Sequence, residues 1–244
     1  MSDIKFVKDY REKELRQYVL AYLLITVAFV GFNTVAELQQ VLGSAANTIP
    51  LILQMVMTDI FLGAVCVLVL ILNEIWSDRI KTRLIYKKMP SNTIFTRIAT
   101  GEVDTSEFDL TQARAIYAHL ATAPSEKQTA EWNLLLRKCR EANHSNVIDA
   151  QRMQLMTRDI FLSTLSLLIM SIAVIASYAF LHNDLNAPIR MLGLPIIYLF
   201  VMLFVTRTSA RNRANRFVEV VIKVDVQDSI TAHTRDDEND ASVS

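Results

Sequence analysis

The chain has 244 residues, with 25 Lys and Arg against 25 Asp and Glu, so its formal net charge is zero. This balance excludes a strongly basic nucleic-acid binder and an acidic disordered chain. Two cysteines and four scattered histidines are too few for a disulfide framework or a zinc site. Because 52% of the residues are hydrophobic and gather in long blocks, the composition indicates a membrane protein.

Four apolar blocks are candidate membrane spans, at 17–35, 50–76, 159–181 and 191–205. A helix needs about 20 apolar residues to cross the hydrocarbon core, and the first three blocks are long enough. The fourth needs its flanks or a thinner bilayer, and its alternative is a buried core helix. We predict an all-α integral membrane protein with four transmembrane helices in two hairpins and a helical cytoplasmic insert.

Lysine and arginine are distributed unevenly along the chain. They crowd the N-terminal segment and the segments that follow the second and fourth spans, whereas the loop 37–50 has none and the loop 182–190 has only Arg190. The positive-inside rule predicts an inner (plasma) membrane protein with both termini and the central segment in the cytoplasm. Five basic residues are expected to contact lipid at the inner face: Arg79, Lys81, Arg83, Arg207 and Arg211.

This topology predicts four parts. Residues 1–77 form an N-terminal segment and the first hairpin, and residues 78–158 form the cytoplasmic insert. Residues 159–206 form the second hairpin, and residues 207–244 form a C-terminal helix and an acidic disordered tail from about Gln227.

The cytoplasmic insert is predicted to be a series of helices. The stretch after the second span has no breaker before Pro90, so we expect it to continue that span, and a short helix should end at Gly101. Asp109 can cap the next helix. Ser125 and Gln128 have capping-box spacing for the one after it, which places Trp132 on its apolar face. A last helix from about Ser145 should run without a break into the third span. The insert is too small to bury much apolar surface alone, so we expect it to need partners, either other subunits or the membrane-proximal helices.

The segment 217–226 fits two patterns. Its valines alternate as in a strand, whereas Phe217, Val218, Val221 and Val224 also share one side of a helix. No turn signal separates this segment from the fourth span, so the helix is favoured.

Small and polar residues recur in steps of four and three along the second and third spans, which puts each set on one side of its helix. The first polar stripe comprises Asp59, Gly63, Cys66, Leu70, Asn73 and Ser77. The second polar stripe comprises Asp159, Ser163, Ser166, Met170, Ala173 and Ser177.

Such stripes have two interpretations. Small residues let membrane helices pack closely, and polar residues hydrogen-bond across the contact. Alternatively the stripes face a polar lumen, which Asp59 favours because an aspartate inside a bilayer is costly. Asp159 stands beside Arg158, and we interpret it as interfacial and uninformative. The candidate pore-lining or helix-interface residues are Asp59, Gly63, Cys66, Asn73, Ser163, Ser166 and Ser177.

The sequence contains no glycine-rich phosphate loop, no GxSxG, no HExxH and no paired-cysteine motif. His119, His144 and Cys139 are interpreted as helix-surface or packing residues. We therefore expect no enzyme, no cofactor and no metal site. Arg97, Arg114, Arg137 and Arg140 are available to a cytoplasmic nucleotide site, without a motif that selects among them.

The layout of these spans, with KTRLIYKKMPSNTIFTRIA between the two hairpins, resembles the four-transmembrane effectors associated with SMODS-type nucleotidyltransferases in bacterial anti-phage systems. The resemblance implies a membrane protein that is silent until a nucleotide second messenger or a cytoplasmic partner protein changes its state. The membrane is then permeabilised.

The expected function is therefore an oligomeric membrane effector that forms or gates an ion-conducting pore under control of its cytoplasmic region. Four helices have too few polar positions to enclose a wide channel, so the conducting species would be a homo-oligomer. The alternative is a non-conducting membrane anchor or scaffold for a soluble partner.

Overall fold

A computed structural model describes residues 13, 15–24, 67–69, 71–86, 89–103, 108–183 and 185–243 of the chain. All regular structure in these residues is helical, and they contain no strand, which agrees with the predicted all-α class. The chain divides into two compact units. The apolar unit comprises residues 1–81 and 156–208, and the insert unit comprises residues 82–155 and 209–244.

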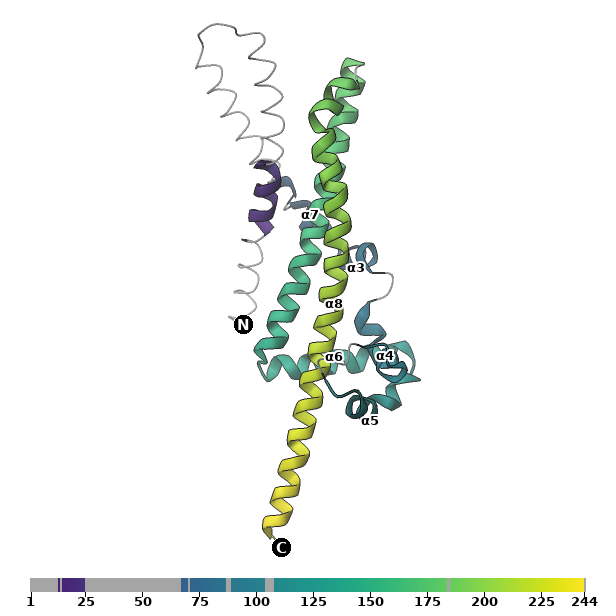
Figure 1. The fold of residues 1–244 in the computed structure, drawn as a ribbon, viewed down its shortest axis with the longest axis vertical. Coiled ribbons are helices and arrows are strands. Elements are labelled where there is room, and N and C mark those ends of the chain that lie inside the picture. The colour runs from purple at the N-terminus through teal and green to yellow at the C-terminus, as the bar shows by residue number, and fades with distance from the viewer. Residues whose placement is uncertain are drawn as a thin grey trace. The chain divides into compact units, whose positions relative to one another are not determined.

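The helices follow one another with short connections (Figure 1). After helical residues at 15–24 and 71–75, the elements are α3 (Asp78–Ile85), a 3-10 turn η1 (Pro90–Asn92), α4 (Ile94–Thr100), α5 (Leu110–Ala121), α6 (Ser125–Glu141), α7 (Ser145–His182) and α8 (Asn186–Val243).

Two helix ends in the insert unit have the predicted chemistry. Gly101 follows α4 with φ of 80°, a left-handed conformation that glycine adopts without steric cost. Asp109 precedes α5, and its side chain accepts a hydrogen bond from the backbone N–H of Thr111 at 2.8 Å. Both predictions are confirmed.

The start of α6 was predicted correctly, but its capping box is wrong. Pro124 is the N-cap residue, and no side chain caps the helix. Gln128 instead donates from Nε2 to the carbonyl oxygen of Ala123 at 3.0 Å. Proline presets the backbone for helix entry, so the helix begins without a serine cap.

The predicted continuation of the second span into the insert is also wrong. The helix ends at Ile75, Trp76 forms a bend, and α3 begins at Asp78. Although no proline or glycine is present, Ser77 and Asp78 favour a new helix start, because serine favours capping positions and an acid in the first turn suits the helix dipole.

Helices α7 and α8 are long and unbroken. α7 runs through 38 residues from Ser145, as predicted for the third span and its cytoplasmic extension. α8 runs through 58 residues, so the helical interpretation of 217–226 is confirmed. The helix also includes the stretch after Gln227, where the sequence predicted a disordered tail.

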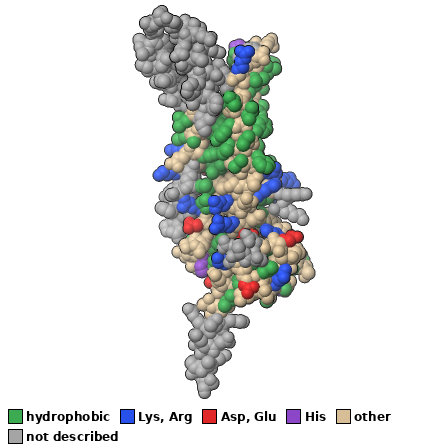
Figure 2. All heavy atoms as spheres, in the orientation of Figure 1, with side chains coloured by type: hydrophobic (Ala, Val, Ile, Leu, Met, Phe, Trp, Pro, Cys, Tyr) green, Lys and Arg blue, Asp and Glu red, His purple; other side chains and the backbone are tan. Residues whose placement is uncertain are grey.

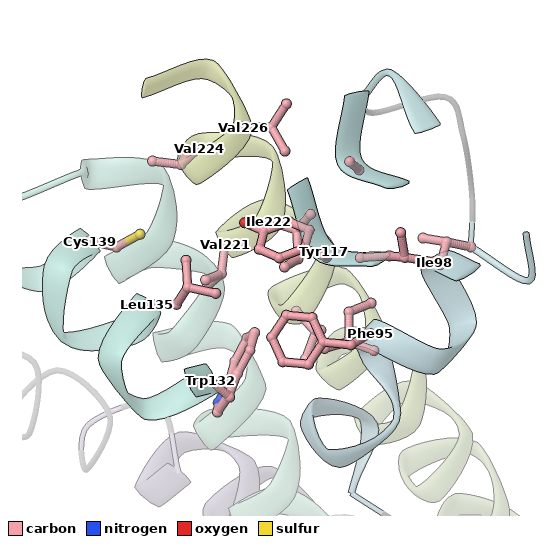
Figure 3. Packing of buried hydrophobic residues seen from close by; sticks show 14 of the residues in the cluster. Phe95, Ile98, Tyr117, Trp132, Leu135, Cys139, Val221, Ile222, Val224 and Val226 are labelled. Atoms are coloured by element: carbon pink, nitrogen blue, oxygen red, sulfur yellow. The ribbon is translucent and has the colours of Figure 1, made fainter. Parts of the chain in front are cut away.

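The core of the insert unit is built around α8 (Figure 3). Trp132 of α6 meets the ring of Phe217 edge-on, with centroids 6.0 Å apart, and Phe95 packs on Tyr117 at 5.3 Å. The α8 side chains in this core are Phe217, Val218, Val221, Ile222, Val224 and Val226. The partner that the insert was expected to need is therefore supplied by the same chain.

The apolar unit has a smaller core and a hydrophobic surface. Its cluster joins the helical residues 15–24 to the second span, α7 and α8, and Tyr22 stacks on Tyr198 at 6.2 Å. Hydrophobic side chains gather over part of the face shown in Figure 2. The exposed large hydrophobic residues include Phe180 at 86% and Phe204 at 75% exposure. Such a surface suits lipid or further protein rather than water.

Two stretches of this structure are long and apolar enough to cross a membrane, by length and composition: Ser145–His182 and Leu192–Thr231. They contain the predicted third span and residues 192–205 of the predicted fourth span. The predicted first and second spans, 17–35 and 50–76, lie largely outside the described residues.

We predict that Phe217→Ala destabilises the insert unit by about 3–5 kcal/mol, since truncating a buried phenylalanine removes apolar contacts and leaves a cavity. Phe217 is 5% exposed and contacts Trp132. Limited proteolysis of the detergent-solubilised protein during a thermal ramp measures the loss. The control is Leu134→Ala on α6, where the side chain is 63% exposed, and equal sensitivity of both variants would contradict the assigned core.

Candidate functional site

The second polar stripe is buried at its first half and exposed at its end. Ser163 and Ser166 are 0% and 2% exposed, whereas Ala173 and Ser177 are exposed. In the first polar stripe, Asn73 is 5% exposed. The predicted site residues Asp59, Gly63 and Cys66 lie outside the described residues, as does Leu70.

Three polar atoms of these stripes are buried without a hydrogen-bond partner among the residues that the structure describes. They are Oδ1 of Asn73, Oγ of Ser163 and Oγ of Ser166. A buried polar atom without a partner costs about 1–3 kcal/mol. These three polar groups would therefore be stabilised by a change of packing that gave them hydrogen-bond partners, or by access to water.

Thr164 provides a contact that the stripe pattern missed. It shares a 2.8 Å hydrogen bond with the hydroxyl of Tyr18 and donates to the carbonyl oxygen of Ile160, also at 2.8 Å. Bonding to a carbonyl one turn earlier is how a hydroxyl is satisfied inside a membrane helix. The contact ties residues 15–24 to α7.

Arg158 binds two carboxylates within the apolar unit. Its Nη1 lies 3.1 Å from Oδ1 of Asp78, and its Nε lies 3.3 Å from Oδ1 of Asp159. Asp159 is 2% exposed, so it is a buried carboxylate of the apolar unit, and its interpretation as interfacial stays a prediction. A buried carboxylate requires a paired charge, which the adjacent guanidinium supplies.

Of the five basic residues predicted to contact lipid, Arg79, Arg83, Arg207 and Arg211 are exposed. Lys81 is only 8% exposed, and Arg211 donates from Nε to the carbonyl oxygen of Ile85 at 2.8 Å. Arg211 therefore also joins α8 to α3 within the insert unit.

Polar contacts to α8 surround the core of the insert unit. Asp225 is 7% exposed and accepts hydrogen bonds from the hydroxyl of Tyr117 at 2.5 Å and from Nζ of Lys138 at 2.8 Å. His144 Nε2 lies 3.2 Å from Oδ2 of Asp228. Because the acids lie on α8 and their partners on α5, α6 and the turn before α7, these pairs fix α8 against the insert.

A second set of contacts joins α4 to α8. Nη2 of Arg97 lies 3.7 Å from Oε1 of Glu219, and Nη1 donates to Oδ1 of Asn215 at 3.3 Å. The same guanidinium donates to the carbonyl oxygen of Glu102. Arg97 is therefore a structural bridge, which removes it from the arginines available to a ligand.

A basic pocket of about 370 Å³ lies in the insert unit between the start of α7 and α8. Its volume is within the usual range for small-ligand sites, about 300–1,000 Å³. Arg213 and Arg216, three residues apart on α8, line this pocket together with Phe217. The remaining lining is contributed by Asn146, Asp149, Ala150, Met153, Val220, Lys223, Val224 and Gln227.

The pocket combines an aromatic side chain with cationic side chains, and cationic side chains form strong hydrogen bonds to phosphate groups. The arginines predicted to be available to a nucleotide site, Arg97, Arg114, Arg137 and Arg140, do not line the pocket. The two arginines of α8 were instead explained by topology alone. α8 packs on the insert, and this packing brings the two arginines beside α7. The sequence pattern did not predict that contact.

Among the described residues, no group of His, Cys, Asp and Glu side chains is placed to hold a metal ion. No family model, no curated protein and no solved structure matches the chain.

Three groups in the insert unit predict a loss of stability at alkaline pH. Burial, followed by the hydrogen bond to Asp225, raises the pKa of Tyr117 above its ordinary value of 10.0. The hydrogen bond to Asp225 raises the pKa of Lys138 above 10.5, and burial raises the pKa of the Cys139 thiol above 9.0.

A raised pKa in the folded state means that the unfolded chain releases its proton first as the pH increases. The stabilisation is therefore complete below pH 9.0, the lowest of the three ordinary values, and decreases above it. We expect the thermal midpoint of the insert unit to fall as pH rises past 9.0, with a smaller fall in Tyr117→Phe. Thermal proteolysis at a series of pH values measures it, and an equal slope in both proteins would contradict the assignment.

Proposed function

We propose that this chain is an oligomeric membrane effector that forms or gates an ion-conducting pore in the bacterial inner membrane. Both hairpins, 17–35 with 50–76 and 159–181 with 191–205, cross the bilayer, and both termini lie in the cytoplasm. The resemblance to anti-phage effectors supports a role in defence against phage. Two described stretches long and apolar enough to cross a membrane support this proposal.

The continuity of α7 and α8 supports the proposal that the insert unit controls the pore. Each is a single helix with residues in both units: α7 from Ser145 to His182 and α8 from Asn186 to Val243. A ligand that moves the insert unit would therefore also move the spanning segments, because continuous helices rather than flexible linkers connect them.

The buried polar atoms of the apolar unit support a silent state in this arrangement. Asn73, Ser163 and Ser166 are closed off from solvent, with no hydrogen-bond partner among the described residues for their Oδ1 and Oγ atoms. If the helices that bury them separated, these atoms would form hydrogen bonds with water. Those bonds would offset part of the free energy lost with the packing contacts. Two arrangements of similar free energy are what a switch requires.

The basic pocket is the proposed control site. Arg213 and Arg216 would bind the phosphates of a nucleotide second messenger, and α7 and α8 form the walls that such a ligand would push apart or hold together. A cytoplasmic partner protein is the other possible controller. The alternative function is a non-conducting anchor or scaffold, for which the insert unit would be the docking module.

We predict ion currents from the purified full-length protein in planar bilayers, and a change of current when nucleotide probes are added at the cytoplasmic face. ATP and cyclic dinucleotides serve as probes. The paired substitution Arg213→Ala and Arg216→Ala should weaken the response at least about tenfold in probe concentration, since each charge-assisted hydrogen bond contributes about 1.5–3 kcal/mol.

The matched control is Arg137→Ala, an exposed arginine of the same unit that pairs with Glu141 on its own helix. It should respond as the unsubstituted protein does. Absence of any current, with and without probes, would exclude the pore and leave the scaffold.

A further inference from the structure

The basic pocket of the insert unit is lined by one side of each of two helices. On α7 the lining residues follow Asn146 at three, four and seven residues. On α8 they follow Arg213 at three, four and seven residues, and again at ten, eleven and fourteen. This spacing puts each set on one side of its helix. The pocket is therefore a space between two helix faces, and each face contributes its own chemistry.

The two faces carry charges of opposite sign that are not paired with each other. α8 supplies Arg213, Arg216 and Lys223, and α7 supplies Asp149. Among the described residues, the side chains of Asp149, Arg213 and Arg216 form no hydrogen bond and no ion pair, so the carboxylate lies more than 4.0 Å from both guanidinium groups. The pocket therefore presents hydrogen-bond donors from α8 and an acceptor from α7 to whatever occupies it.

A ligand that satisfies both faces has an anionic group for the arginines and hydrogen-bond donors for the carboxylate. A phosphate group alone satisfies only the first requirement, because Asp149 would repel it. A nucleotide satisfies both when the edge of its base carries donors. A carboxylate is acceptor-only and has two oxygens, so the best match is a base edge with two adjacent N–H donors.

Guanine is the base with such an edge. Its ring N1–H and its exocyclic N2 amino group lie side by side and match the two oxygens of a carboxylate. Adenine instead has its amino group next to the unprotonated ring nitrogen N1, which is an acceptor and is repelled by a carboxylate. The carboxylate of Asp149 therefore favours guanine over adenine.

We propose that the basic pocket is a guanine-nucleotide site, in which Arg213 and Arg216 bind the phosphates and Asp149 accepts hydrogen bonds from N1–H and N2–H of the base. The inference rests on the proposed nucleotide control of the insert unit and adds the identity of the base. The apolar members of the lining supply contact surface for a planar ring. They include Ala150, Met153, Val220 and Val224.

The first test compares GDP with ADP, which differ only in the base. Isothermal titration calorimetry on the purified full-length protein in detergent measures both affinities. GDP should bind at least about tenfold more tightly than ADP, which is the discrimination of one good bidentate base contact. In Asp149→Ala the two affinities should become equal. Asp149 is exposed, so the substitution removes no core packing.

The variant Asp149→Asn tests the direction of the hydrogen bonds. Xanthine has a carbonyl group where guanine has its amino group, and an asparagine amide offers one acceptor and one donor. Asp149→Asn should therefore bind XDP at least about tenfold more tightly than GDP, the reverse of the unsubstituted protein. A merely structural role of Asp149 would weaken both nucleotides alike, and that result would overturn the proposal.

Glu126→Gln is the matched control, because it makes the same change from carboxylate to amide on an exposed residue of α6 outside the pocket lining. It should keep the preference for GDP. The paired substitution Arg213→Ala and Arg216→Ala should weaken GDP and ADP by the same factor, since the phosphates are common to both.

The outcomes separate this inference from the proposed function. Equal affinities of the unsubstituted protein for GDP and ADP, both lowered by the paired arginine substitution, would overturn the guanine site and leave the nucleotide control site in place. Absence of binding by either nucleotide would overturn both. Neither result bears on conduction, which the planar-bilayer measurement decides separately.

Discussion

The structure depends on the burial of one side of α8 in the insert unit. Residues from Phe217 to Val226 supply about a third of that core, including side chains that are fully buried. Without them the apolar side chains of α4, α5 and α6 would lose about a third of the core that buries them, and a unit of this size depends on every buried group. Hydrogen bonds then hold α8 in place. Asp225 of α8 accepts hydrogen bonds from α5 and α6, and Arg97 of α4 donates one to Asn215 of α8.

This arrangement gives α8 two roles in one helix. Its first part is apolar and exposed, and its later part is the core of a helical unit that contains a basic pocket. α7 has a similar division, with Asn146 and Asp149 at the pocket and Ser163 and Ser166 in the buried stripe. Any ligand at the pocket therefore contacts the two helices that also carry the candidate spans, which is the physical basis of the proposed control.

Local signals in the sequence predicted local structure well. Gly101, Asp109 and the apolar side of 217–226 each have a single physical explanation, and each prediction is confirmed. The break at Ser77 was missed because only proline and glycine were considered as breakers, whereas a serine followed by an aspartate can also start a new helix. The burial of Asp159 depends on Arg158 and Asp78, which lie far apart in sequence, and the pocket depends on α8 returning to the insert. Such long-range contacts have no periodic signal.

The central claim is that the insert unit lies on one side of a membrane and the loop between α7 and α8 on the other. Single cysteines at Leu185 and Leu134, both exposed, test it in a background with Cys66→Ala and Cys139→Ala. In right-side-out vesicles, a membrane-impermeant maleimide should label the Leu185→Cys thiol, and should label Leu134→Cys only after detergent is added. Labelling of Leu134→Cys in sealed vesicles, or of Leu185→Cys only after detergent, would contradict the account.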